Sequence, residues 1–141
     1  MPRPTHPPLG LQLARTAKAA QRAFDDALVA AGGSLPVWLV LVTLKSQQVA
    51  NQRELAEAVG VQWATLTHHL NAMESAGLVT RRRDPANRRV HQVGLTDDGD
   101  ELFLRLRAVA GAFDNRLRAG LSEADVTEFE AVLARLRGNL T

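Results

Sequence analysis

Five arginines lie close together in this chain, at Arg81, Arg82, Arg83, Arg88 and Arg89, with a single aspartate among them. Guanidinium groups bind phosphates through their charge and their forked N–H donors, so such a cluster is typical of a protein that contacts a polyanion. A solvated loop is the alternative for an isolated arginine run. The chain carries a formal net charge of only +2, so the position of the arginines is more informative than their number.

A group of polar side chains precedes the arginines, on a stretch whose apolar residues have helical spacing. Leu66, Leu70 and Met73 would form the buried side of this helix, which leaves the opposite side to face a ligand. Asparagine is suited to adenine, and the methyl group of threonine to thymine. The candidate DNA-contacting residues of this helix are Trp63, Thr65, Thr67, His68 and Asn71.

Two residues of this helix have alternative interpretations. The indole of Trp63 could pack against a sugar or a thymine methyl group, or it could fold back on the preceding helix. His69 is interpreted as a half-buried packing residue. Adjacent His68 and His69 point about 100° apart on a helix, whereas a zinc site favours histidines four residues apart on one face. The chain also has no cysteine, so the sequence predicts neither a metal site nor a cofactor.

A second short helix is predicted just before the helix that carries the polar residues. Leu55, Ala56 and Val59 recur at helical spacing, and Gly60 follows where a helix end needs a positive φ. Asn51 and the glutamate three residues later form a capping box at its start. Helix, tight turn and helix in this order predict a helix-turn-helix, whose second helix enters the DNA major groove. The arginines would then lie on a basic hairpin, or wing, that follows the second helix.

Long helices are predicted at both ends of the chain. Residues 9–31 and residues 96–118 carry apolar side chains at steps of three and four, and a last helix begins near Ser122. Residues 35–46 are apolar nearly all round, which indicates a buried helix. The apolar stripes of the terminal helices have no obvious partner in the central segment. We therefore expect one protomer (residues 1–141) of an obligate homodimer, with residues 9–31 and 96–140 for dimerisation and residues 35–95 as the DNA-binding lobe.

These residues resemble the multiple antibiotic resistance regulator (MarR) family of bacterial winged-helix transcription factors, over about residues 9–140. The motifs that carry the resemblance are Leu35-Pro36-Val37-Trp38, Glu54-Leu55-Ala56, Gly60-Val61, Thr65-Leu66-Thr67, Glu74-Ser75-Ala76-Gly77-Leu78-Val79, Asp84-Pro85, Arg88-Arg89 and Leu95-Thr96. The resemblance implies a mainly α fold with a small β-wing, in a dimer whose two recognition helices enter successive major grooves of a palindromic site. It also implies that Arg89 enters the flanking minor groove.

The chain departs from the family pattern at several positions that matter for DNA. Gln62 stands where family members usually have a serine cap, and Trp63 where a polar residue is common. His68 replaces a common base-reading arginine, and Asn87 replaces the aspartate that orients the wing arginine. The DNA sequence that relatives bind therefore does not transfer to this chain.

The resemblance also implies a small-molecule site where the DNA-binding lobe meets the dimerisation helices. For each candidate taken alone, a residue of the plain core is the favoured interpretation. The absence of a clear buried charge favours a mostly apolar or aromatic effector. The candidates are Phe24, Trp38, Leu41, Phe103 and Leu106.

Enzyme activity is not expected, because the sequence has no Gly-rich phosphate loop, no nucleophilic serine motif, no cysteine and no evident carboxylate pair. No apolar run is long enough for a bilayer, and residues 1–8 lack the apolar segment of a signal peptide. We expect a cytoplasmic bacterial regulator that binds specific double-stranded DNA, a repressor released by an effector. The alternatives are a winged-helix module for protein contacts and a sequence-tolerant architectural DNA binder.

Overall fold

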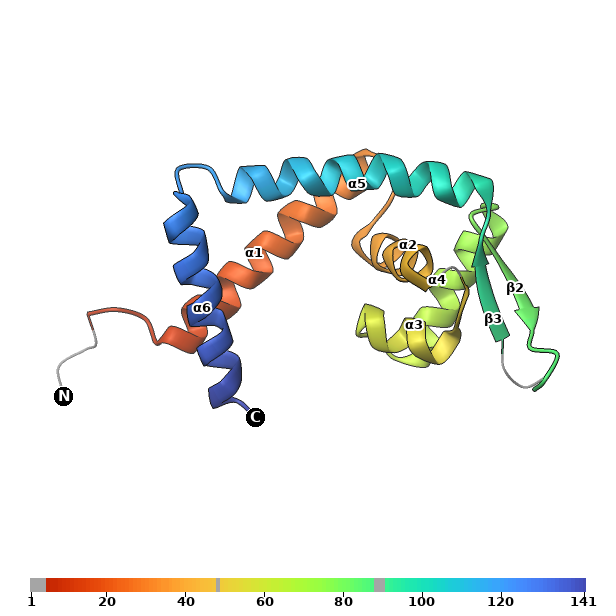
Figure 1. Cartoon of the computed structure of the whole chain (residues 1–141), viewed down its shortest axis with the longest axis horizontal. Helices are drawn as coiled ribbons and strands as arrows, with labels where there is room; N and C mark the ends of the chain where they lie inside the picture. The colour runs from red at the N-terminus through yellow and green to blue at the C-terminus, as the bar shows by residue number, and fades with distance from the viewer. Residues whose placement is uncertain (1–4, 48, 88–90) are drawn as a thin grey trace. The chain divides into compact units, whose positions relative to one another are not determined.

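The computed structural model describes residues 5–47, 49–87 and 91–141, which form a mainly helical fold with a small sheet. The helices are α1 (Leu9–Ala30), α2 (Leu35–Gln47), α3 (Gln52–Val59), α4 (Trp63–Ser75), α5 (Asp97–Leu117) and α6 (Glu123–Asn139) (Figure 1). The strands are β1 (Val49–Asn51), β2 (Val79–Arg83) and β3 (His91–Leu95). The predicted fold class, mainly α with a winged helix-turn-helix, is confirmed.

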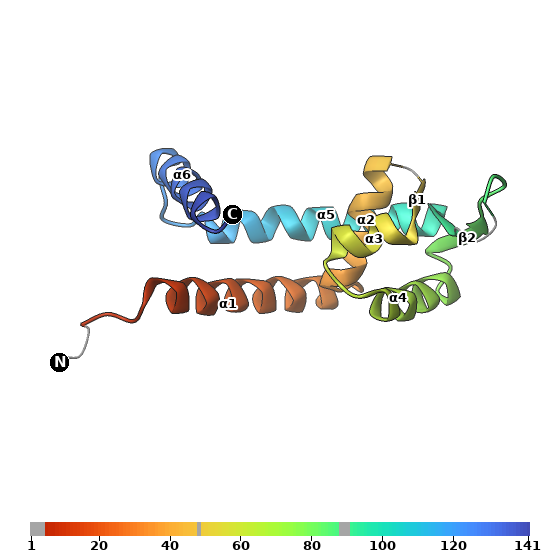
Figure 2. The ribbon, with the colours of Figure 1, turned by 90° about the horizontal axis from the view of Figure 1, so that it is seen from below.

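The chain divides into two compact units, residues 1–110 and residues 111–141. The first unit holds α1 to α4, the sheet and the first part of α5, and the second holds the end of α5 and all of α6. In the first unit α2 packs on α3, and α3 packs on α4 (Figure 2). The helix-turn-helix is thus built on α2, whose Val40, Leu41 and Leu44 are fully buried. This burial explains why α2 is apolar on nearly every side.

The turn between α3 and α4 follows from its residue types. Gly60 ends α3 with a φ of 74° and donates its N–H to the carbonyl of Ala56, as expected for a glycine C-cap. Asn51 caps the start of α3 by accepting the N–H of Glu54 at 2.8 Å. The predicted capping box differs in one respect, because the Glu54 carboxylate accepts the side-chain amide of Asn51 at 3.0 Å.

The sheet is antiparallel and has the order β1-β3-β2, so β3 is its central strand. Strand β1 was not predicted; its Ala50 pairs with Val93 of β3, and the strand runs directly into α3. On the other side of β3, Arg81 of β2 pairs with the same Val93. Val79 and Val93 are buried. The wing, defined here as residues 79–95, therefore shares its central strand with the segment that leads into the helix-turn-helix.

The beginning of α5 is held against the turn that follows α4. The Thr96 hydroxyl accepts the N–H of Gly99 at 3.0 Å, and the Thr96 N–H donates to the carbonyl oxygen of Leu78 at 3.1 Å. A Cβ atom on Gly99 would lie 2.2 Å from that oxygen. Only glycine fits this contact, because no side chain can approach a backbone oxygen so closely.

The second unit is a helical hairpin with no buried residue on α6. A capping box starts α6, since Ser122 Oγ accepts the N–H of Asp125 at 3.1 Å and the Asp125 carboxylate accepts the N–H of Ser122 at 2.9 Å. Large apolar side chains remain exposed in this unit. They are Leu117, Leu121, Phe129, Val132 and Leu140.

No single helix within the described residues is long and apolar enough to cross a membrane. Helices α1 and α2 meet the criteria of length and hydropathy only as a pair, bent by 80° between them.

Candidate nucleic-acid interface

Helix α4 has the two sides that the sequence predicts. Leu66, Leu70 and Met73 are buried, while Trp63, Thr65, His68 and Asn71 are exposed. The Trp63 side chain has 55% of its surface exposed, so it is not folded away under α3. Thr67 is half-buried, and its hydroxyl donates to the carbonyl oxygen of Trp63 at 2.9 Å. The exposed side of α4 can therefore offer an indole, an imidazole, an amide and a hydroxyl to a ligand.

The first turn of α4 lacks a side-chain cap. Gln62 occupies the cap position with an extended backbone, and its side chain makes no capping hydrogen bond. Most of the first N–H groups of a helix have no partner within the helix, and a preceding serine or aspartate side chain usually accepts one of them. At Gln62 the chain thus keeps the weaker cap that was noted in the sequence.

The three arginines of β2 have different surroundings. Arg81 lies on the same strand face as the buried Val79, and only 19% of its side chain is exposed. Its Nη2 donates to the Glu74 carboxylate at 3.0 Å and also to the side-chain oxygen of Asn71. Arg82 and Arg83 are exposed. The structure therefore separates one anchored arginine from two arginines that face solvent.

The ionic partner of Arg81 is Glu74 on α4, at 3.0 Å, and not Asp84, the aspartate that lies among the arginines in sequence. Asp84 instead organises the turn after β2, where its carboxylate accepts the N–H of Ala86 at 2.8 Å and its carbonyl accepts that of Asn87 at 3.2 Å. Such a turn is the usual role of an aspartate at the first position. The hydrogen bond and the charge of Arg81 lower the pKa of Glu74, so this carboxylate stays ionised at neutral pH.

Two of the predicted DNA-binding residues, Arg88 and Arg89, lie outside the described residues. The turn at 84–87 and strand β3 flank them in sequence.

The segment that contains α4 and most of the wing resembles known proteins in sequence. Residues 34–91 match the sequence model of the MarR family. This chain belongs to the MarR family. The uncharacterized HTH-type transcriptional regulator YdgJ of Bacillus subtilis (strain 168) is 33% identical over 101 residues, or 72% of this MarR-family chain. The match spans only 62% of the length of YdgJ.

Solved structures of MarR-type regulators superpose on the chain over most of its length. A MarR-family regulator from Rhodococcus sp. RHA1 is 27% identical, with a TM-score of 0.79 and 91% of each chain covered. The transcriptional repressor CouR bound to a 23-mer DNA duplex is 26% identical, with a TM-score of 0.83 and 92% of each chain covered. CouR from Rhodococcus jostii RHA1 bound to p-coumaroyl-CoA is 27% identical, with a TM-score of 0.76 and 91% of this chain and 90% of CouR covered.

The histidines of this MarR-family chain do not gather around a common point. The rings of His68 and His69 have centroids 6.0 Å apart and planes inclined by 59°. His69 is half-buried, in agreement with its interpretation as a packing residue, whereas His68 is exposed. Among the residues that the structure describes, no three histidine, aspartate or glutamate side chains are placed to share a metal ion.

The candidate effector residues of the MarR-family chain lie in or against the core of the first unit. Trp38 and Phe103 stack with ring centroids 5.6 Å apart and planes inclined by 10°. Leu41 and Leu106 are fully buried, and Phe24 packs at the edge of the same core. The structure thus brings all five residues into one apolar region.

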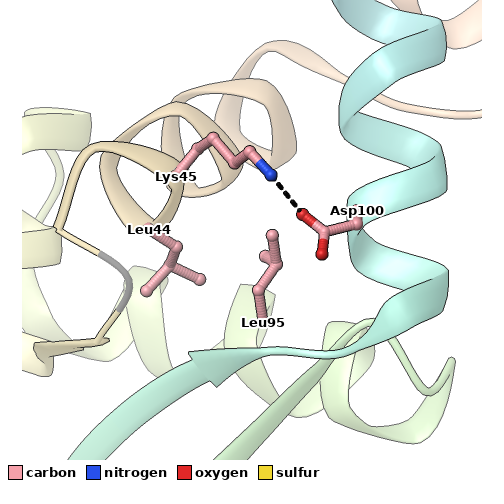
Figure 3. A pocket seen from close by; sticks show the side chains of 4 residues that line it. All are labelled: Leu44, Lys45, Leu95 and Asp100. Carbon is pink, nitrogen blue, oxygen red and sulfur yellow. Dashed lines mark hydrogen bonds and ion pairs between the residues drawn. The ribbon is translucent and has the colours of Figure 1, made fainter.

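A cavity of about 260 Å³ lies next to this region and is lined by Leu44, Lys45, Leu95 and Asp100 (Figure 3). Lys45 Nζ lies 2.8 Å from the Asp100 carboxylate and 5.6 Å from the centre of the Phe103 ring. The sequence analysis missed both charged residues. Lys45 is the single charged residue of α2. A lone charge on an otherwise apolar helix was the signal in the sequence that could have identified it.

Proposed function

We propose that the chain is a sequence-specific DNA-binding regulator of transcription, most simply a repressor, with no catalytic activity. The observation that carries this proposal is the exposed polar side of α4 next to the solvent-facing Arg82 and Arg83 of β2. A helix of this kind suits base edges in the major groove, while exposed arginines suit phosphates. CouR, which has the same fold, is described as a repressor and has been solved on DNA. Such a regulator would act in the bacterial cytoplasm, where it meets chromosomal DNA.

A homodimer is part of this proposal, and the exposed apolar residues support it. On α1 only Leu28 is buried, while Leu9, Leu11 and Leu13 are exposed. The second unit exposes five large apolar side chains and buries none on α6. Patches of this kind on a soluble chain mark a protein interface. A second copy would cover them and would place two copies of α4 on a palindromic duplex.

Release by a small effector is the third element of the proposal. The stacked Trp38 and Phe103 offer an aromatic surface, and Lys45 beside them offers a cation. We therefore propose that the effector is mostly apolar or aromatic, with p-coumaroyl-CoA on CouR as an example from a protein of the same fold. In the Trp63→Phe variant, Trp38 is the only tryptophan, and an effector at this site should change its fluorescence.

Electrophoretic mobility shift tests the DNA-binding proposal directly. The probe is the DNA upstream of the gene for this chain, with random-sequence duplex as competitor and a series of salt concentrations. A specific regulator should give a shifted band that random duplex competes poorly and that weakens steeply with salt. A band that random duplex removes with equal ease would favour an architectural binder. Absent or salt-insensitive binding would favour a winged-helix module for protein contacts.

A further inference from the structure

Arg81 connects the recognition helix to the wing through two side chains of α4. Its Nη2 donates both to Asn71 Oδ1 and to Glu74 Oε1. Asn71 and Glu74 are three residues apart, so they lie on neighbouring turns of one helix face. Asn71 is exposed, while Arg81 is mostly covered. One guanidinium thus holds the amide of a residue that is placed to read DNA.

The chemistry of arginine decides which amide atom is held. A guanidinium carries only N–H donors and no acceptor, so the amide atom beside it must be the oxygen. The amide nitrogen of Asn71 is bonded to the same carbon as this oxygen and diverges from it, so its N–H groups are not directed at Arg81. Glu74 keeps the guanidinium in place, because the two groups form a charge-assisted hydrogen bond.

We infer that Arg81 is a positioning residue for DNA reading, which presents Asn71 to the major groove as a hydrogen-bond donor. This inference rests on the proposed function. A free asparagine pairs with adenine by using its oxygen and its nitrogen together. The oxygen has a second lone pair, but Arg81 fixes its direction, so the amide is oriented with its N–H groups toward the groove. These N–H groups match acceptors such as N7 and O6 of guanine or O4 of thymine. This orientation favours an acceptor-rich base edge over the edge of adenine, which needs the amide oxygen as well.

Arg81 is mostly covered and paired with Glu74, so we expect that it does not contact a phosphate. Each phosphate contact contributes about 0.9 to the slope of log affinity against log salt concentration. A positioning residue contributes to base preference without contributing to this slope. Arg82, which is exposed on the neighbouring strand position, provides the matched control for a phosphate contact.

The test begins with selection from a pool of duplexes with a randomised centre, using the full-length wild-type protein. The selected site is then changed one base pair at a time, and Asn71→Ala identifies the position that Asn71 reads. We expect guanine or thymine there, and a loss of discrimination of about fivefold or more in Asn71→Ala. Arg81→Met, which keeps an unbranched apolar stem, should lose discrimination at that same position with an unchanged salt slope. Arg82→Ala should keep the discrimination and lower the slope by about 0.9 for each contact.

The double variant Asn71→Ala, Arg81→Met separates positioning from an independent contact. If Arg81 acts through Asn71, adding Arg81→Met to Asn71→Ala should change base preference no further. Arg81→Lys, which keeps a charge and a donor, should restore part of the preference, and circular dichroism should show that each variant is folded. The inference would be overturned by a reduced salt slope in Arg81→Met or by additive effects in the double variant. Selection of adenine at the position that Asn71 reads would overturn it as well. If wild-type protein selects no sequence, the proposed function itself fails, and the inference fails with it.

Discussion

The polar side chains on the exposed side of α4 differ in what they can still bind. Asn71 already accepts a hydrogen bond from Arg81, and the Thr67 hydroxyl donates to a backbone carbonyl in its own helix. His68 is exposed. We therefore expect His68 to contact DNA directly, whereas Asn71 and Thr67 already form hydrogen bonds within the protein.

His68→Ala should lower the affinity for the selected DNA site, because it removes an exposed imidazole from the side of α4 that is proposed to face the major groove. His68→Gln keeps a polar side chain that can form hydrogen bonds with base edges, so it should lose less affinity than His68→Ala. Fluorescence anisotropy of a labelled duplex measures the wild type and both variants.

Equal DNA affinities for the wild type and His68→Ala would remove His68 from the residues that contact DNA.

At the scale of elements, the wing has an anchored end and an exposed end. Val79 and Arg81 face the protein at the start of β2, whereas Arg82 and Arg83 face solvent before the turn. Arg89 follows that turn in sequence, and we propose that it enters the minor groove. Minor-groove width depends on base sequence, whereas phosphates are the same everywhere.

Arg89→Ala and Arg82→Ala should therefore weaken DNA binding in different ways. The loss in Arg89→Ala should grow with the A·T content of the flanks, because narrow A·T grooves concentrate negative potential. The loss in Arg82→Ala should be the same for all flanks. Mobility shifts on duplexes that share one core and differ only in their flanks give the comparison, and parallel losses in both variants would contradict it.

The first turn of α5 should be intolerant of any side chain at Gly99. A Cβ atom there would lie 2.2 Å from the Leu78 carbonyl oxygen and 3.1 Å from Leu95 Cγ. Gly99→Ala must push α5 away from the turn, and we expect a loss of about 1–3 kcal/mol in the free energy of unfolding. Urea denaturation followed by circular dichroism measures this loss.

Gly111, on the same helix, is the matched control. A Cβ atom there meets nothing within 4 Å, so Gly111→Ala should be neutral or should stabilise the helix by up to about 1 kcal/mol. Equal unfolding free energies for the two variants would show that the contact between Gly99 and Leu78 is not tight.

At the scale of the whole molecule, the exposed apolar residues predict self-association. Phe129 of α6 is 58% exposed, which is unfavourable for a side chain of this size in water. Phe129→Asp should raise the dissociation constant of the homodimer by at least about tenfold, since burying one such side chain contributes about 1.5–3 kcal/mol. Sedimentation velocity over a series of protein concentrations measures the constant.

Glu130→Gln changes the charge of the neighbouring exposed residue and should leave the homodimer intact. A wild-type protein that sediments as a monomer at micromolar concentration, or a Phe129→Asp variant as dimeric as wild type, would rule out this interface.

Patterns within one element were readable from the sequence, whereas pairings between elements were not. The helix bounds, the positive φ of Gly60 and the buried side of α4 follow from local spacing and turn chemistry. Strand β1 has only three residues and gives no periodic signal, so it was missed. The partner of Arg81 depends on how β2 lies against α4, which no spacing within either element reveals. The Lys45–Asp100 pair joins residues 55 positions apart in the sequence for the same reason.

The strand order β1-β3-β2 has a consequence for the solubility of the protein. It leaves β2 at an edge of the sheet, where unpaired N–H and C=O groups could join a strand of another molecule. Exposed charges on an edge strand oppose such pairing, because two like-charged edges repel. We therefore expect Arg82 and Arg83 to oppose aggregation even when no DNA is bound. Replacing both arginines with neutral residues should cause precipitation as well as weaker DNA binding. Light scattering of the protein without DNA would detect the precipitation separately from the loss of DNA binding.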